Sequence, residues 1–179
     1  MHPLVQRFWI ATLLASLPRL AVAQSASIAD SIVLERTLCY GSCPAYRVSI
    51  SRVGEVRFES RRPGDSGRTA SDRIAAERVR SLTAQAVALG FFQLPDSIRS
   101  DKRLCPDMAT DHPTVITIVA LAGVVHRVVD YRGCFARSDH SVVDSVAKLR
   151  AYEAAIDSAA GSARWVRPSR SARNAAGRR

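Results

Sequence analysis

Four cysteines, at positions 39, 43, 105 and 134, constrain the fold of this chain more than any other feature. An even set of cysteines forms a disulfide framework in an oxidising compartment, whereas in a reducing one it more often binds metal or takes part in catalysis. The cysteines can therefore be interpreted only after the compartment has been inferred from the N-terminus.

The N-terminus has the pattern of a secretory signal peptide. Arg7 precedes an apolar run over residues 8–17, and Ala21 and Ala23 are the small residues that a signal peptidase requires. A membrane-spanning helix needs about 20 apolar residues, roughly twice the length of this run. We expect residues 1–23 to be removed and the mature protein to be secreted or periplasmic, with no transmembrane segment.

In an oxidising compartment four cysteines can pair in three ways. We favour Cys39–Cys43 together with Cys105–Cys134. Gly41 lies within the first pair, so a turn there can bring the two Cα atoms within about 6 Å of each other. The second pair joins the segment before one expected strand to the end of its hairpin partner. In the chain-entropy model such a bridge, closing about 29 residues, contributes roughly 3–4 kcal/mol.

Hydrophobic periodicity predicts one α+β domain over residues 31–163. Period-two alternation and β-branched runs predict five strands, over residues 31–36, 46–52, 55–60, 114–121 and 124–131. Apolar residues three and four apart predict two helices, one ending at Gly90 and one starting near Ser138. The order βββαββα favours an antiparallel sheet of about five strands with both helices packed on one face.

The remaining segments are expected to be loops or flexible ends. Residues 24–30 form a flexible lead, and 62–71 form a loop after which Ser71 or Asp72 caps the first helix. Residues 95–113 are expected to be irregular.

The formal charge of +10 is concentrated at the C-terminus. Arg7 and Arg19 leave with the signal peptide, and residues 164–179 contain six arginines and no acidic residue. We expect this segment to be a basic disordered tail, because residues 167–179 contain no large apolar side chain. The same residues contain no aromatic side chain to stack on bases, so no nucleic-acid partner is expected.

Residues 34–46, LERTLCYGSCPAY, resemble the signature of an exported bacterial family, the domain of unknown function 6438. The family pattern is R-T-x-C-Y-G-x-C-P-x-Y, followed by a hairpin, a T-D-x-P segment and a second hairpin that ends near Y-x-G. This chain has TDHP at 110–113 and YRG at 131–133. The resemblance covers roughly residues 31–158. It implies export and a single domain, and it brings no known activity.

The cysteines also suggest a redox function, which we consider as an alternative. Thiol exchange requires a lowered thiolate pKa, which Arg36 and Arg47 could provide for Cys39 and Cys43. The C-x-x-x-C spacing between strands lacks the βαβ context of a thioredoxin-like motif. A structural role for this pair is therefore favoured.

Catalytic and metal sites have weaker support in the sequence. Thr110, Asp111 and His112 form a candidate polar site, but no H-E-x-x-H or G-x-S-x-G motif accompanies them. The candidate metal ligands, none at helical zinc spacing, are His112, His126, His140, Asp107, Asp111, Asp130 and Asp139. We assign no catalytic residue, metal or cofactor. The favoured function is a non-enzymatic binding or envelope-associated module; its partner is unknown, and an envelope component or a protein is a candidate.

Overall fold

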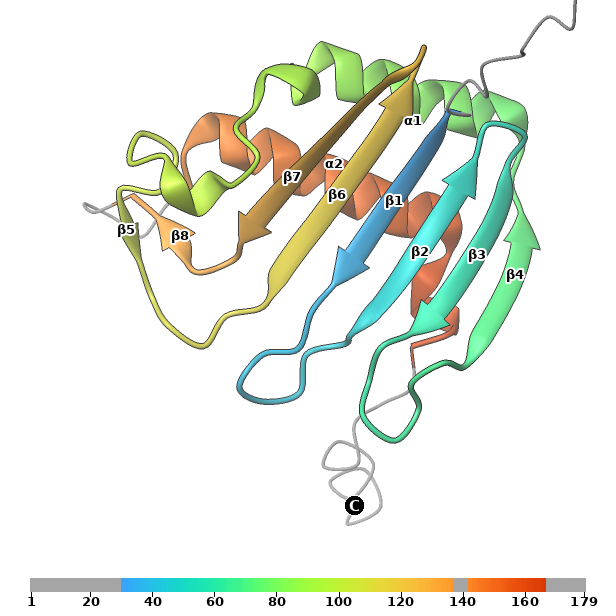
Figure 1. The fold of residues 1–179 in the computed structure, drawn as a ribbon, viewed down its shortest axis with the longest axis horizontal. Coiled ribbons are helices and arrows are strands. Elements are labelled where there is room, and N and C mark those ends of the chain that lie inside the picture. The colour runs from blue at the N-terminus through green and yellow to red at the C-terminus, as the bar shows by residue number, and fades with distance from the viewer. Residues whose placement is uncertain (1–29, 137–141, 167–179) are drawn as a thin grey trace, which may run out of the picture.

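The computed structural model describes residues 30–136 and 142–166, which form a six-stranded antiparallel sheet covered on one face by two helices (Figure 1). This confirms the predicted α+β class, with one strand more than expected. From one edge to the other, the strands are β4 (Thr69–Arg73), β3 (Glu55–Ser60), β2 (Tyr46–Ser51), β1 (Ser31–Arg36), β6 (Thr114–Leu121) and β7 (Val124–Tyr131).

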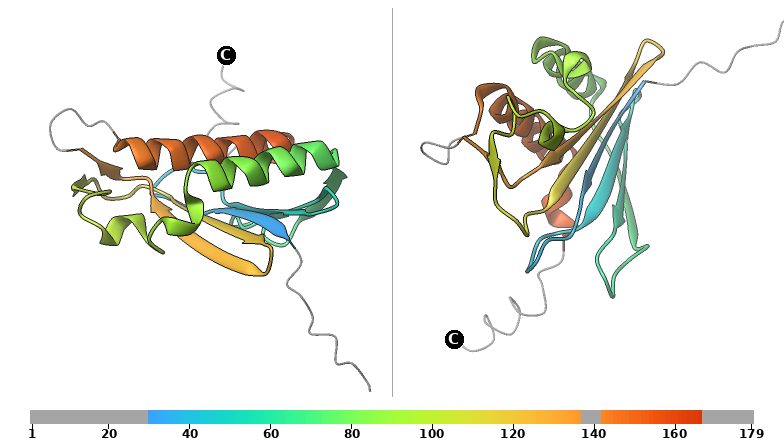
Figure 2. Two further views of the ribbon diagram at one scale, coloured as in Figure 1. Left: turned by 90° about the horizontal axis from the view of Figure 1, so that it is seen from above. Right: turned by 60° about the vertical axis from the view of Figure 1, so that its left-hand side comes forward.

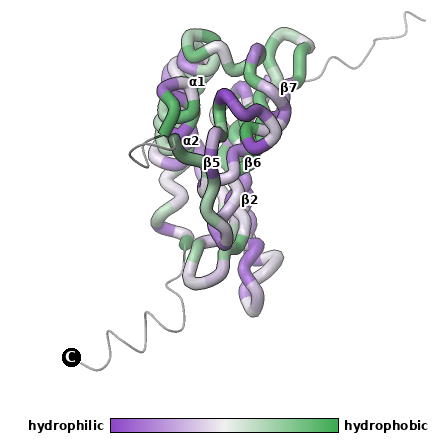
Figure 3. The backbone as a smooth tube through the Cα atoms, turned by 90° about the vertical axis from the view of Figure 1, so that its left-hand side faces the viewer, coloured by the Kyte–Doolittle hydropathy of each residue, from purple (hydrophilic) through white to green (hydrophobic). Residues whose placement is uncertain are grey.

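Both helices lie on the same side of the sheet, as predicted (Figure 2). They are α1 (Ala76–Ala88) and α2 (Asp144–Ala160). Seen from the side of the small sheet formed by β5 (Asp107–Met108) and β8 (Cys134–Phe135), the helices form one layer and the strands another (Figure 3). None of the described helices is long and apolar enough to cross a membrane.

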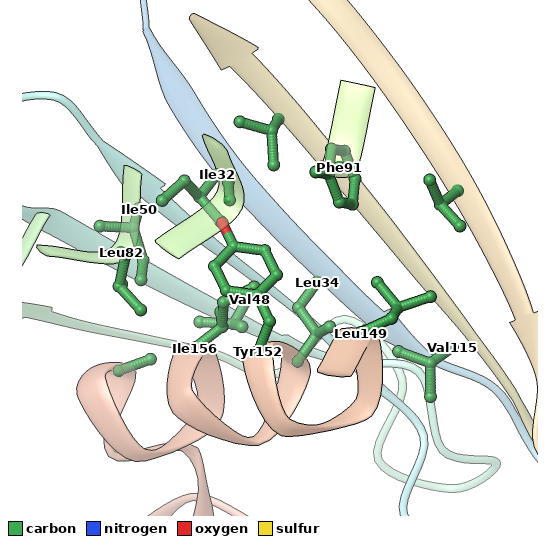
Figure 4. Packing of buried hydrophobic residues seen from close by; sticks show 14 of the residues in the cluster. Ile32, Leu34, Val48, Ile50, Leu82, Phe91, Val115, Leu149, Tyr152 and Ile156 are labelled. Atoms are coloured by element: carbon green, nitrogen blue, oxygen red, sulfur yellow. The ribbon is translucent and has the colours of Figure 1, made fainter. Parts of the chain in front are cut away.

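The core lies between these two layers. In β2, Tyr46, Val48 and Ile50 are buried beneath the helices, whereas the residues between them are only half-buried, as period-two alternation requires. From the other side, α2 contributes Leu149 and Tyr152, which meet the side chains of β1 and β2 (Figure 4). Each fully buried aliphatic side chain of this kind contributes about 1.5–3 kcal/mol.

Strand β4 corrects the prediction of a loop over 62–71 followed by a helix capped by Ser71 or Asp72. Both residues belong to β4, and α1 starts at Ala76 after Ala75, without a side-chain cap. Four of the five β4 side chains are exposed, so this edge strand carries no alternating apolar signal. Its pairing with β3 places Val56 opposite Asp72 and is made by the backbone.

The second helix starts later than predicted. Its first residue is Asp144 and its N-cap is Val143, whereas the expected start near Ser138 lies outside the described residues. Its C-terminal end leads into the turn that carries Trp165, whose ring packs 5.4 Å from that of Phe58. The folded part therefore continues to Val166, past the expected boundary at residue 163; residues 24–29 and 167–179 lie outside the described residues.

Candidate functional site

The cysteines form two disulfides with the favoured pairing. Cys39–Cys43, with a Cα–Cα distance of 5.6 Å, closes the loop between β1 and β2 and is half-buried. Cys105–Cys134, at 4.9 Å, is buried and ties the irregular segment before β5 to β8. Tyr40, inside the first loop, is 90% exposed. One bridge therefore belongs to the core and the other to a surface loop.

The predicted polar site forms an exposed turn beside that loop. The Tyr40 backbone N–H donates to the Asp111 carbonyl at 3.3 Å. The Tyr131 hydroxyl donates to the Ala109 carbonyl at 2.8 Å and accepts from the His112 backbone N–H at 3.3 Å. The Thr110 hydroxyl donates to the Asp111 carboxylate at 3.2 Å. These contacts account for the three residues as parts of a turn.

Gly133 lets this turn lie against the end of β7. A Cβ atom at this position would lie 2.3 Å from the Ala109 carbonyl oxygen and 2.5 Å from the Tyr131 ring. Both distances are far below van der Waals contact, so only glycine fits here.

The candidate metal ligands do not converge within the described residues, where no three His, Cys, Asp or Glu side chains are placed to hold an ion. His126 packs edge-on against Phe91, and its Nε2 lies 2.9 Å from the Leu94 carbonyl oxygen. Asp130 is buried and engaged by arginines. Asp139 and His140 lie outside the described residues.

A buried ion-pair network, missed by sequence reasoning, fastens α2 to the sheet. The carboxylates of Asp130 and Glu153 are fully buried. Arg150 Nε lies 3.0 Å from Asp130 Oδ2, and Arg132 contacts both carboxylates. Glu153 also accepts from the Thr117 hydroxyl at 3.3 Å. Burial raises the pKa of Glu153 to about 7, although the charge of Arg132 opposes the shift.

The network continues towards the Cys39–Cys43 loop. Arg36 Nε donates to Asp157 Oδ2 at 2.7 Å, and the Tyr46 hydroxyl donates to Asp157 Oδ1 at 2.7 Å. Burial, and then the charge of Asp157, raise the pKa of Tyr46 far above its usual value. These groups bind one another across the interface between α2 and the sheet, and they therefore hold the helix in place.

A groove lies at the opposite end of the sheet, between α1 and the strand ends; we call it the α1 groove. Its volume is about 680 Å³. It is lined by residues from α1, the start of β1, the turn between β2 and β3, and the end of β6. Figure 1 shows these parts of the chain at the same end of the sheet. Its apolar lining consists of Ile32, Val53, Ala76, Val79, Ala84, Val87, Ala120 and Leu121.

Three charged side chains line the α1 groove. Asp30 Oδ1 accepts from the Ala122 backbone N–H at 2.9 Å, and Arg80 pairs with Glu77 at 2.7 Å. The guanidinium of Arg52 has no ion-pair or hydrogen-bond partner in the part of the chain that the structure describes. Within the described residues, the groove thus combines apolar walls with one arginine that has no partner.

Residues 30–153 match the sequence profile of a family described as "Domain of unknown function (DUF6438)". The chain belongs to this family. The matched region spans the whole six-stranded sheet, both disulfides and all residues of the α1 groove, so the groove is part of the DUF6438 domain itself. The curated proteins contain no match to this chain.

The groove of this DUF6438 domain could not be predicted from the sequence for a physical reason. On α1, Val79, Leu82 and Ala86 form the buried face that the periodicity predicts. The neighbouring face carries Ala84 and the 57% exposed Val87, and nothing covers it among the described residues. Small side chains on an amphipathic helix do not reveal whether a neighbouring element fills the space beside them.

Proposed function

We propose that this DUF6438 protein is an exported, disulfide-stapled binding module that holds a small, largely apolar molecule in the α1 groove. The groove itself supports this proposal: about 680 Å³ bounded mainly by apolar side chains. Ligand sites typically have volumes of about 300–1,000 Å³, apolar walls and a few polar groups. The proposal is of binding without catalysis, since the titratable residues of the buried network face one another and do not line the groove.

Export is supported by the two disulfides and by the N-terminal sequence. Disulfides persist in oxidising compartments, and residues 1–23 have the pattern of a cleavable signal peptide. Intact mass of protein purified from the periplasm should correspond to a chain that starts at Gln24 and has no free thiol. A mass that includes residues 1–23, or four alkylatable cysteines, would contradict export with oxidative folding.

Ligand binding can be tested with N-phenyl-1-naphthylamine, an uncharged apolar dye that fluoresces on leaving water. Val87 lines the groove, and the neighbouring Ala88 is exposed and does not. Val87→Asp should weaken dye binding on the order of tenfold or more, because the dye would have to desolvate a carboxylate. Ala88→Asp adds the same charge at the same helix end and should bind the dye like the wild type.

Two results of this experiment would contradict the proposal. One is the absence of saturable dye binding to the folded wild-type protein. The other is equal binding by Val87→Asp and Ala88→Asp, which would place the dye elsewhere on the surface.

A thiol–disulfide redox function is the second candidate, favoured by the partial exposure of Cys39 and Cys43. The two nearby arginines offer it little support, because Arg36 pairs with Asp157 at 2.6 Å and Arg47 with Glu35 at 3.1 Å. A carboxylate thus balances the charge of each arginine, which reduces its ability to stabilise a thiolate. A reduction potential of Cys39–Cys43 below about −300 mV would indicate a structural bridge, and one above about −200 mV a redox function.

A further inference from the structure

We infer that the ligand of the α1 groove is an amphipathic anion, with its apolar chain along the groove and a carboxylate-type head group on Arg52. This inference rests on the proposed function and adds the chemical class of the ligand. It is carried by the position of one guanidinium, unpaired among the described residues, at the edge of an apolar surface.

Arg52 is held at the groove by a tightly fixed turn. Its backbone N–H donates to the Asp30 carbonyl at 3.1 Å, and the Gly54 N–H donates to the Ser51 carbonyl at 2.9 Å. Gly54 has φ +85°, and a Cβ there would lie 2.1 Å from the Ile74 carbonyl oxygen, so only glycine allows this turn. The backbone that carries Arg52 is therefore ordered before any ligand arrives, which lowers the entropy lost on binding.

The charged side chains that line the groove are Asp30, Arg52 and Arg80, and local partners engage two of them. Arg80 has Glu77, and Asp30 has the Ala122 N–H. Of these three side chains, only the Arg52 guanidinium has no hydrogen-bond or ion-pair partner in the part of the chain that the structure describes. A guanidinium offers parallel N–H donors that match two oxygens of a carboxylate or a phosphate, and the single charge of Arg52 is balanced by the single charge of a carboxylate.

The apolar walls determine the rest of the ligand. Val53, next to Arg52 in the same turn, is 51% exposed, and Val87 across the groove is 57% exposed. Covering exposed apolar side chains with a ligand contributes binding free energy in proportion to the apolar area removed from water. A head group on Arg52 therefore leaves the ligand's chain between Val53 and α1, where these side chains would cover it.

The test compares ligands of equal chain length by displacement of N-phenyl-1-naphthylamine at pH 8, below their micelle concentrations. The probes are decanoate, 1-decanol and decylammonium. The wild-type protein should bind decanoate on the order of tenfold tighter than decanol, as expected for a charge-assisted hydrogen bond, and decylammonium more weakly than either. Raising the salt concentration should reduce the preference for decanoate, because Arg52 is exposed.

Two variants assign the preference to one residue. Arg52→Gln should bind decanol like the wild type and lose its preference for decanoate. Arg57→Gln removes the same charge from an exposed position on β3, outside the groove, and should keep the preference.

Equal affinity of the wild type for decanoate and decanol would overturn the inference while leaving apolar binding intact. A preference for decanoate that persists in Arg52→Gln would overturn it as well. If the dye does not bind, or none of the three compounds displaces it, the proposed function itself fails.

Discussion

Glu153 lies on the buried side of α2, between Thr117 and Arg132, with Asp130 and Arg36 nearby. Between its ordinary pKa of about 4.5 and the raised value of about 7, the folded protein holds a proton that the unfolded chain has released. The contribution of this proton to the free energy of unfolding, up to about 3 kcal/mol, is thus fully present below pH 4.5 and is lost as the pH rises through 7.

We therefore expect the melting temperature of the wild type, relative to that of Glu153→Gln, to fall by several degrees between pH 5 and pH 8. Glutamine keeps the shape and the hydrogen bond to Thr117 but does not titrate. Taking the difference between the two proteins removes the effects of other titrating groups. A difference that stays constant or increases with pH would show that Glu153 is ionised throughout this range.

At the scale of elements, the two disulfides should differ in their contribution to stability. Cys105–Cys134 joins residues 29 apart, and Cys39–Cys43 joins residues 4 apart. In the chain-entropy model, losing the first costs about 3–4 kcal/mol and losing the second about 2 kcal/mol. Replacing the buried pair also removes packing, since both cysteines belong to the core.

Urea unfolding of Cys105→Ala/Cys134→Ala and of Cys39→Ala/Cys43→Ala measures both contributions. The first double variant should be the less stable of the two. The opposite order would mean that the surface loop, and not the Cys105–Cys134 bridge, makes the larger contribution.

The elements also show where sequence reasoning succeeds and where it fails. The strands of the two hairpins were predictable from alternating apolar and polar residues, as in Tyr46 to Ser51, where buried and half-buried side chains alternate. Strand β4 was not predictable, because residues such as Ser71 and Asp72 are typical of turns. Their side chains are exposed at the sheet edge, and only their backbone pairing with β3 makes them a strand. The position of Glu153 on the buried face of α2 was a signal of the ion-pair network, since a charge at such a position needs a partner.

At the scale of the whole molecule, the order of the predicted strands and helices indicated the layer arrangement but not the strand order. The order β4-β3-β2-β1-β6-β7 places β1 centrally, between strands from both hairpins. Its start therefore lies at the α1 groove and its end leads into the Cys39–Cys43 loop. The candidate polar site at Asp111 and the groove thus occupy opposite ends of the sheet, a separation that depends on tertiary packing.

Binding in the α1 groove is tested most directly by a methyl NMR titration of the mature protein with 1-decanol, which contains no charged group. Saturable shifts are expected at the methyl groups of Ile32, Val53 and Val87, which line the groove. Val115, paired with Arg36 at the far end of β1, should stay unperturbed. Shifts centred on Val115, or none at any methyl group of the groove, would contradict the claim that this domain binds its ligand beside α1.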